Sequence, residues 1–222
     1  MTKLSVIITA GGSSRRYGQT NKLLEKIEGK EVIIHSIEAF IPFSPFEIIV
    51  SATESLENSL KELLVKYNIE NIKIVRGGDT RQASIYNALK QCSDPDIVAI
   101  HDAARPLVKK TDIDKCLQKA VATGAAIVAV KAVDTIKVVN ENNKIEATPD
   151  RNTLWAVQTP QIFDYKLIFE AHEKLQGQSF SDDAGMLEYL GKEVYVSEGS
   201  RSNIKITTPE DLLIAKILYE NV

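Results

Sequence analysis

A glycine-rich, basic segment follows the first apolar run of the chain. Residues 9–18 read Thr-Ala-Gly-Gly-Ser-Ser-Arg-Arg-Tyr-Gly, and Lys22 comes shortly after them. Small residues let the backbone approach a ligand closely, so that amide groups can surround phosphate oxygens. Arg15, Arg16 and Lys22 add three cations within eight positions. The segment predicts a site for nucleotide phosphates, although a glycine-rich turn with solvated cations would look the same. It contains neither a dinucleotide-binding fingerprint nor a Walker motif, so it leaves the reaction open.

Two further polar loops follow later apolar runs. Residues 77–84 read Gly-Gly-Asp-x-Arg-x-x-Ser, and residues 101–106 read His-Asp-Ala-Ala-Arg-Pro. Asp79 and Ser84 could hydrogen-bond the edge of a base, and Asp102 could hold Mg²⁺ or a ribose hydroxyl. Each loop alone is equally compatible with a turn that caps the next helix. Three such loops on one rim favour a ligand site.

Isolated polar residues later in the chain suggest a second anion site. Arg151 and Lys205 are the cations that we assign to it, although each could also be solvated or salt-bridged. The three histidines, His35, His101 and His172, share no spacing typical of a zinc site or of a nucleophile and its base. We expect all three to be structural.

The elements that must position these residues alternate along the chain. Short apolar runs predict buried strands at 4–8, 47–50, 72–75, 97–100 and 126–130, and amphipathic segments predict helices at 32–40, 56–67, 81–92 and 111–123. Apolar strands separated by helices imply an α/β fold with a mostly parallel sheet, covered by helices on both faces. Ligands bind outside the carboxyl ends of such strands. The loops after Ile8, Val75 and Ile100 should therefore share one rim.

The pattern changes in the last third of the chain. Residues 134–139 and 144–147 alternate polar and apolar around the turn-forming residues 140–143, which predicts a projecting β-hairpin. A second subunit is the simplest candidate to cover it. Further expected elements are helices at 165–175 and 182–190, strands at 194–196 and 204–206, and a helix beginning at 208–211. We expect one domain, residues 1–222, with a β-arm at about 134–150.

Composition excludes several classes of protein. Hydrophobic residues make up 44% and charged residues 26% of the 222 residues, and the net charge is −3. This balance argues against a surface built for nucleic acid or for an anionic membrane. No apolar run has the length of a membrane span or of a secretory signal. We expect a cytoplasmic protein.

In order along the chain, the motifs resemble those of the 2-C-methyl-D-erythritol 4-phosphate cytidylyltransferase family. The segments that carry the resemblance are 10–18 with Lys22, 77–81, 101–106, 150–155, 158–161 and 203–207. The resemblance covers residues 4 to about 215. It implies a Rossmann-like nucleotide-diphosphosugar transferase fold and a homodimer joined through the arm. It also implies transfer of a cytidylyl group from CTP to methylerythritol phosphate, with release of pyrophosphate, in non-mevalonate isoprenoid biosynthesis. The cofactor would be Mg²⁺ or another divalent cation.

The resemblance also implies roles for individual residues. The CTP phosphates would be held by Ala10, Gly11, Gly12, Arg15, Arg16 and Lys22. Cytosine would be recognised by Gly78, Asp79 and Ser84, with Asp102 and Ala103 near the ribose and Asp102 also near the metal. The acceptor phosphate would be positioned by Arg151 and Lys205, with Arg105, Thr135, Thr159 and Ser181 close to it. Arg16, Lys22, Arg151 and Lys205 would form the catalytic set.

Some positions depart from the usual pattern of the family. Ser14 replaces a common glycine, Tyr17 a common methionine and Ser181 a threonine, while Asn-Lys-Leu at 21–23 replaces Pro-Lys-Gln. The lysine is kept, so the departures affect the path of the loop rather than the chemistry.

Three alternatives stay open at this point. A ribitol-5-phosphate cytidylyltransferase would share fold and reaction, but Ala104 and the Leu154-Trp155 pair favour methylerythritol phosphate. A non-catalytic nucleotide-binding regulator would not need Lys22, Asp102, Arg151 and Lys205 together. A uridylyl- or guanylyltransferase would differ only in the base that it accepts.

Overall fold

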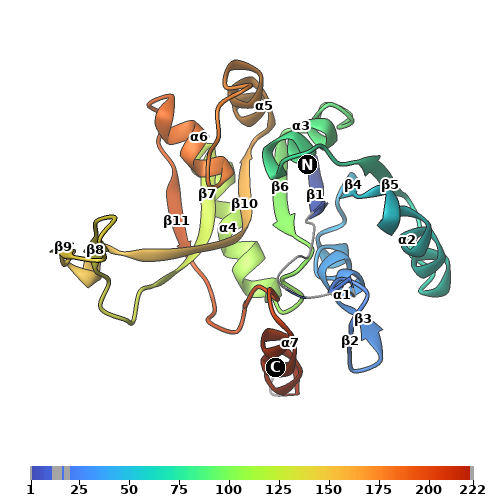
Figure 1. Ribbon diagram of the computed structural model, residues 1–222. Helices are drawn as coiled ribbons and strands as arrows, with labels where there is room; N and C mark the ends of the chain where they lie inside the picture. The colour runs from blue at the N-terminus through green and yellow to red at the C-terminus, as the bar shows by residue number, and fades with distance from the viewer. Residues whose placement is uncertain (1, 12–16, 18–20, 221–222) are drawn as a thin grey trace.

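The computed structural model describes residues 2–11, 17 and 21–220 and contains a seven-stranded sheet (Figure 1). The strands lie in the order β11-β7-β10-β6-β1-β4-β5. Their bounds are β1 Leu4–Ala10, β4 Glu47–Ala52, β5 Ile72–Arg76, β6 Ile97–Asp102, β7 Ala125–Lys131, β10 Trp155–Asp164 and β11 Tyr195–Glu198. β10 is antiparallel to β6 and β7, and the other neighbours pair in parallel. This confirms the predicted mostly parallel α/β sheet.

Helices cover both faces of the sheet, as predicted. They are α1 Val32–Glu38, α2 Glu54–Lys66, α3 Arg81–Leu89, α4 Lys110–Thr123, α5 Tyr165–Lys174, α6 Asp183–Tyr189 and α7 Pro209–Tyr219. Alternate side chains of β1 point to opposite faces. Val6 and Ile8 join a core with α1, α2, α4 and α7, whereas Ile7 joins a core with α3, α5 and α6. Each face of the sheet thus has its own apolar layer.

The start of each helix near the site depends on local capping. Thr80 caps α3, because its hydroxyl accepts a hydrogen bond from the Ala83 amide at 3.0 Å. Asp182 caps α6 by accepting from the Gly185 amide at 3.0 Å. These caps make Arg81 and Asp183 the first residues of their helices.

The predicted hairpin is present, with shorter strands than expected. Its strands are β8 (Val138–Val139) and β9 (Ile145–Ala147), and the Asn140 amide donates to the Lys144 carbonyl at 3.0 Å across the turn. It projects from the body between β7 and β10 (Figure 1). Because the chain returns from this arm directly beside β7, β10 must run antiparallel to β7.

Other details differ from the sequence-based expectation. The expected strand at 204–206 does not form; that segment is held instead by the Ile206 amide, which donates to the Ala104 carbonyl at 2.8 Å. Four short elements were not predicted: β2 (Lys26–Ile27), β3 (Lys30–Glu31), and the 3₁₀ turns Ile41–Phe43 and Arg151–Thr153. Within the described ranges, no helix is long and apolar enough to cross a membrane.

The carboxyl ends of the central strands meet at one edge of the sheet. Thr9 at the end of β1 pairs with Asp102 at the end of β6, while Ala52 of β4 pairs with Ala10 on one side and Arg76 on the other. The three polar loops of the sequence therefore leave the sheet on one rim, as predicted.

Candidate active site

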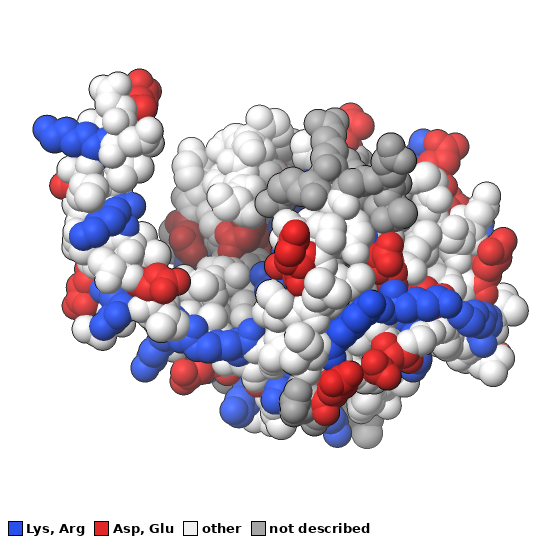
Figure 2. All heavy atoms as spheres, turned by 60° about the horizontal axis from the view of Figure 1, so that its bottom comes forward, with Lys and Arg blue, Asp and Glu red and all other residues white. Residues whose placement is uncertain are grey.

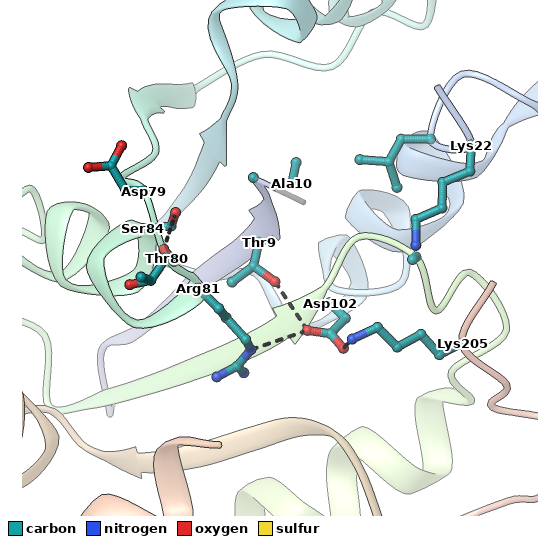
Figure 3. A pocket seen from close by; sticks show the side chains of 12 residues that line it. Thr9, Ala10, Lys22, Asp79, Thr80, Arg81, Ser84, Asp102 and Lys205 are labelled. Atoms are coloured by element: carbon teal, nitrogen blue, oxygen red, sulfur yellow. Dashed lines mark hydrogen bonds and ion pairs between the residues drawn. The ribbon is translucent and has the colours of Figure 1, made fainter. Parts of the chain in front are cut away.

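A cavity of about 470 Å³ opens at this rim (Figure 3). Its wall combines the ends of β1 and β6, the start of α3 and the segment before α7. The lining residues are Thr9, Ala10, Gly11, Lys22, Leu23, Asp79, Thr80, Arg81, Ser84, Asp102, Ala104 and Lys205. The fold thus brings together seven predicted site residues: Ala10, Gly11, Lys22, Asp79, Ser84, Asp102 and Lys205. Gly12, Arg15 and Arg16 lie outside the described residues.

Asp102 is the electrostatic centre of this wall. Lys205 Nζ lies 2.7 Å from its Oδ2, and Arg81 Nε lies 3.8 Å from its Oδ1 (Figure 3). Thr9 Oγ1 donates to Oδ1 at 3.2 Å. Burial opposes ionisation of this carboxyl, but the charges of Lys205 and Arg81 outweigh it and hold the pKa of Asp102 below its ordinary range. The side chain is therefore an ionised carboxylate at neutral pH.

A second cavity of about 320 Å³ adjoins the first. It is lined by Arg81, Asp102, Arg105, Val157, Gln158, Thr159, Gln161, Ser181, Asp182 and Lys205. Four of the six residues that the family resemblance assigned to the acceptor lie here: Arg105, Thr159, Ser181 and Lys205. Arg81, Asp102 and Lys205 line both cavities. The Asp102–Lys205 ion pair therefore stands on a shared wall.

A buried hydrogen-bond chain fixes the backbone at Asp102. The Asp102 amide donates to Thr159 Oγ1 at 3.0 Å, and the Thr159 hydroxyl faces His101 Nδ1 at 3.0 Å. His101 Nε2 lies 3.1 Å from the Arg105 carbonyl, which can only accept. His101 is thus the Nε2–H tautomer, and its Nδ1 accepts from Thr159. Burial lowers the pKa of His101 to about 4, so the ring is neutral. This agrees with the structural role expected for His101.

The turn before α3 is shaped from within by Ser84. Its hydroxyl accepts from the Gly78 amide at 3.0 Å and lies 2.8 Å from the Thr80 carbonyl. A Cβ on Gly78 would lie 2.5 Å from the Cβ of Ala83, so only glycine fits there. Ser84 was predicted to read cytosine; in the structure it lines the larger of the two cavities, while its hydroxyl hydrogen-bonds the turn.

Two contacts tie the Lys205 segment to the rest of the site. Arg105 Nη1 donates to the Asn203 carbonyl at 2.7 Å, and Lys22 Nζ donates to the Ile206 carbonyl at 2.7 Å. Asn203 is fully buried, and its Nδ2 donates to the Thr159 carbonyl at 2.9 Å. Lys205 is consequently presented from a fixed backbone, although its own side chain is partly exposed.

Some predicted site residues do not line either cavity. Thr135 and Arg151 are exposed residues at the arm, and Arg151 Nη1 donates to the Val133 carbonyl at 2.9 Å. Ala103 is completely buried, and its neighbour Ala104 lines the larger cavity instead. Within one chain, the described structure therefore does not join the arm residues to the cavities.

The carboxylates available to a metal are few. Among residues 2–11, 17 and 21–220, no cluster of three His, Cys, Asp or Glu side chains could hold an ion. Mg²⁺ commonly binds through one or two carboxylates together with substrate phosphates. The ionised Asp102 on the cavity wall fits that kind of site, in which the nucleotide would supply the other ligands.

Sequence reasoning missed three residues that shape the site. Arg81 belongs to a motif that drew attention, but it received no role; its Nη1 lies 2.8 Å from Asp183 Oδ2. Gln161 joins β10 to α6, because its Oε1 accepts from the Asp183 amide at 3.2 Å. The available signals were Asp182 and Asp183 at the start of α6 and Arg81 at the start of α3. Neither pattern shows that Arg81 and Asp183 pair with each other.

Comparisons with known proteins agree with this geometry. The sequence profile of the family described as IspD, 2-C-methyl-D-erythritol 4-phosphate cytidylyltransferase, matches residues 4–221. A protein of that name from Caldanaerobacter subterraneus is 44% identical over 223 residues and covers 98% of each chain. Another, from Clostridioides difficile, is 44% identical over 218 residues, covering 96% of this chain and 92% of its own.

Solved structures share the fold over the same length. The crystal structure of 4-diphosphocytidyl-2C-methyl-D-erythritol synthase from Anaerococcus prevotii superimposes with a TM-score of 0.89 at 31% identity, covering 99% of both chains. The cytidylyltransferase structure from Thermus thermophilus gives a TM-score of 0.79 at 29% identity, covering 97% of this chain and 98% of that one.

Proposed function

The chain belongs to the 2-C-methyl-D-erythritol 4-phosphate cytidylyltransferase family, and we propose that its two adjoining cavities divide the family's reaction between two substrates. The protein transfers the cytidylyl group of CTP to 2-C-methyl-D-erythritol 4-phosphate in isoprenoid biosynthesis, releasing pyrophosphate. The observation that carries the proposed division is the Asp102–Lys205 ion pair on the wall between the cavities.

The larger cavity is the proposed CTP site. Ala10 ends β1 and Gly11 follows it, with backbone that a phosphate can approach, and Lys22 supplies a positive charge on the cavity wall. Gly12, Arg15 and Arg16 of the same loop are proposed to extend this phosphate site. Cytosine is assigned to the Gly78–Ser84 turn, with Asp79 as the side chain that reads it.

The smaller cavity is the proposed acceptor site. Lys205 and Arg105 would hold the acceptor phosphate, with the hydroxyls of Thr159 and Ser181 close to it. Two phosphorylated molecules repel each other, so cations on the dividing wall are needed to bring them together. The ion pair with Asp102 holds the Lys205 ammonium group at that position before either substrate arrives.

The chemistry needs alignment and charge stabilisation rather than a general base. The acceptor phosphate is largely dianionic at neutral pH, since its second pKa is about 6. One of its oxygens forms the new bond to the α-phosphorus of CTP, and the bond from that phosphorus to the bridging oxygen breaks as pyrophosphate leaves. Lys22 would stabilise the negative charge that spreads over the phosphates in the transition state.

A divalent cation, Mg²⁺, is proposed as the cofactor. The ionised carboxylate of Asp102 would hold it, together with oxygens of the triphosphate. When bound, the cation would supply neutralisation of phosphate charge at the reacting phosphorus.

A homodimer joined through the arm is proposed to complete the site. The arm carries exposed apolar side chains, with Val139 50% and Ile145 56% exposed, and it stands apart from the body in Figure 2. Arg151 and Thr135 do not line the cavities of their own chain, so we assign them to the acceptor site of the partner subunit.

Cytoplasmic location stays a prediction; the free thiols of Cys92 and Cys116 agree with a reducing compartment.

The division between cavities is tested by substrate-specific kinetics. Pyrophosphate release is measured with CTP and either methylerythritol phosphate or ribitol 5-phosphate; we expect turnover with the first. In Lys205→Ala the KM for the acceptor should rise by roughly tenfold or more, with little change in the KM for CTP. Lys192→Ala, an exposed lysine that lines neither cavity, is the matched control. A selective loss of CTP affinity in Lys205→Ala would contradict the assignment.

A further inference from the structure

Arg81 occupies the boundary between the two cavities, and the proposed reaction gives it no role. It is the first residue of α3, and its side chain lines both the nucleotide-side and the acceptor-side cavity. In Figure 3 the guanidinium points toward Asp102, opposite Lys205. Its Nε lies 3.8 Å from Asp102 Oδ1. A positive charge therefore stands on each side of the Asp102 carboxylate.

The far side of Arg81 is anchored by a buried carboxylate. Arg81 Nη1 lies 2.8 Å from Asp183 Oδ2, and the Asp183 side chain is only 1% exposed. Asp183 is itself held on two sides. Its Oδ1 accepts from His172 Nε2 at 3.2 Å, and its amide donates to Gln161 Oε1 at 3.2 Å. The anchor is thus fixed to both α5 and β10, which leaves it little freedom to move.

We propose that Arg81 is a further positively charged residue of the reacting centre and that Asp183 is its positioning residue. This inference rests on the proposed assignment of the two cavities. A guanidinium has five N–H donors in a rigid plane. With Nη1 engaged by Asp183, the remaining donors are available to phosphate oxygens at the place where the two cavities meet.

The placement suits a charge that acts on the transition state. Negative charge spreads around the α-phosphorus as the acceptor oxygen approaches and pyrophosphate departs. Donors that are already oriented stabilise such charge without rearranging during the reaction. Without the ion pair to Asp183, the Arg81 side chain would instead have several orientations. Asp183 selects one of them, because it holds one edge of the guanidinium while the other edge faces Asp102.

A purely structural ion pair between α3 and α6 is the competing interpretation. Such a pair would influence the free energy of unfolding but not turnover by the folded enzyme. Removing Arg81 alone would leave Asp183 as an unpaired buried charge, which destabilises proteins strongly. The variants must therefore include one that removes both charges.

The test compares kcat and both KM values in Arg81→Lys, Asp183→Asn and Arg81→Met/Asp183→Asn. Thermal melting monitors folding of each variant. Arg76→Met/Glu54→Gln is the matched control, because it removes another arginine–carboxylate pair whose members line neither cavity. Lys205→Ala is measured beside them as the test of the cavity assignment.

We expect kcat to fall by roughly 10²–10³-fold in the double variant and by about tenfold in Asp183→Asn, with both KM values changed less than about threefold. Arg81→Lys should retain more activity than the double variant. Single Arg81→Met, where it folds, should be no better than the double variant, because Asp183 acts through Arg81.

Folded variants with the turnover of the control would overturn the inference. If they occur while Lys205→Ala raises the acceptor KM, the cavity assignment stands and only the role of Arg81 is wrong. A normal acceptor KM in Lys205→Ala combined with low kcat in the Arg81 variants would instead refute the acceptor assignment and leave Arg81 in the reacting centre.

Discussion

The rim of the sheet and the projecting arm differ in whether their side chains find partners within the chain. At the rim, polar side chains are held by partners within the chain: Asp102 by Lys205 and Thr9, and Thr159 by His101. At the arm, Val138, Val139 and Ile145 are about half exposed. The rim is organised before any ligand arrives, whereas the arm exposes apolar area that a solitary chain does not bury.

This difference predicts which steps, nucleotide binding or turnover, a single chain can carry out. Under the proposed assignment, the rim should bind CTP without a partner, since the described residues assigned to CTP all belong to one chain. The residues near the arm, Arg151 and Thr135, lack a position in either cavity of their own chain. We therefore expect nucleotide binding to be a property of the subunit and turnover to be a property of the dimer.

Lys22→Ala gives the largest expected effect on the rim. Turnover should fall by roughly 10²–10³-fold, because one cation that stabilises the transition state is lost. The melting temperature should fall by only a few degrees, since the change removes one hydrogen bond, from Lys22 Nζ to the Ile206 carbonyl. Pyrophosphate release by purified protein measures the effect, with the exposed Lys115→Ala as control. Turnover close to wild type would remove Lys22 from the catalytic set.

Subunit mixing tests whether the arm serves the partner's site. Lys22→Ala and Arg151→Ala chains are given different tags, and hybrid dimers are isolated by both tags. If Arg151 acts across the interface, one site of the hybrid carries both defects and the other carries none. The hybrid should then recover about half of the wild-type turnover, although both parent dimers are nearly inactive.

Hybrids as inactive as their parents would show that Arg151 acts on its own chain. The matched control is a hybrid of Lys22→Ala with Lys205→Ala. Both of these residues line the same cavity in one chain. In that hybrid each site retains one defect, so its turnover should not exceed the mean of its two parent dimers.

The smallest expected effect concerns stability at the rim and its pH dependence. Burial holds the pKa of His101 at about 4, below its value in the unfolded chain. As the pH falls from about 6.5 to about 4, the unfolded state takes up a proton that the folded state does not bind. The free energy of unfolding therefore falls, by up to about 1.4 kcal/mol per pH unit.

His101→Gln should reduce this loss, because glutamine can keep both hydrogen bonds and does not titrate. Urea unfolding at pH 7, 6 and 5 measures the difference in free energy between the two proteins. The wild type should lose more stability than the variant on acidification. Equal slopes would mean that folding does not lower the pKa of His101.

The sequence allowed the main sheet to be predicted for local reasons. Apolar runs such as 4–8 and 97–100 are buried on both faces in a parallel sheet, so they show no alternation and are recognisable without any partner. The capping threonine and proline at 208–209 marked the start of α7 equally well. The direction of β10 and the loss of the strand at 204–206 could not be foreseen. Both depend on which segment lies beside which, and an apolar run carries no such information.

Residue types and their order were enough to predict which groups meet at the rim. The glycine-rich loop, Asp79 and Asp102 follow strands whose carboxyl ends must share one edge. Lys205 was assigned to a second anion site from its residue type, and the family resemblance connected it with the acceptor phosphate; no local pattern places it at the rim. What the sequence could not supply was the network of charges: that Asp183 holds Arg81, and that Lys205 pairs with Asp102 on a wall between two cavities.

Secondary structure and the position of the loops were determined by short-range patterns, because hydrophobic periodicity, turn residues and caps act within a few positions of each other. The charge network and the shared wall were decided only by tertiary structure. Coulomb attraction and hydrogen bonding depend on distances of a few ångströms, and those distances are set by packing between segments that are remote in sequence. The arm also depends on tertiary structure, because Thr135 and Arg151 line neither cavity that the described part of the chain forms.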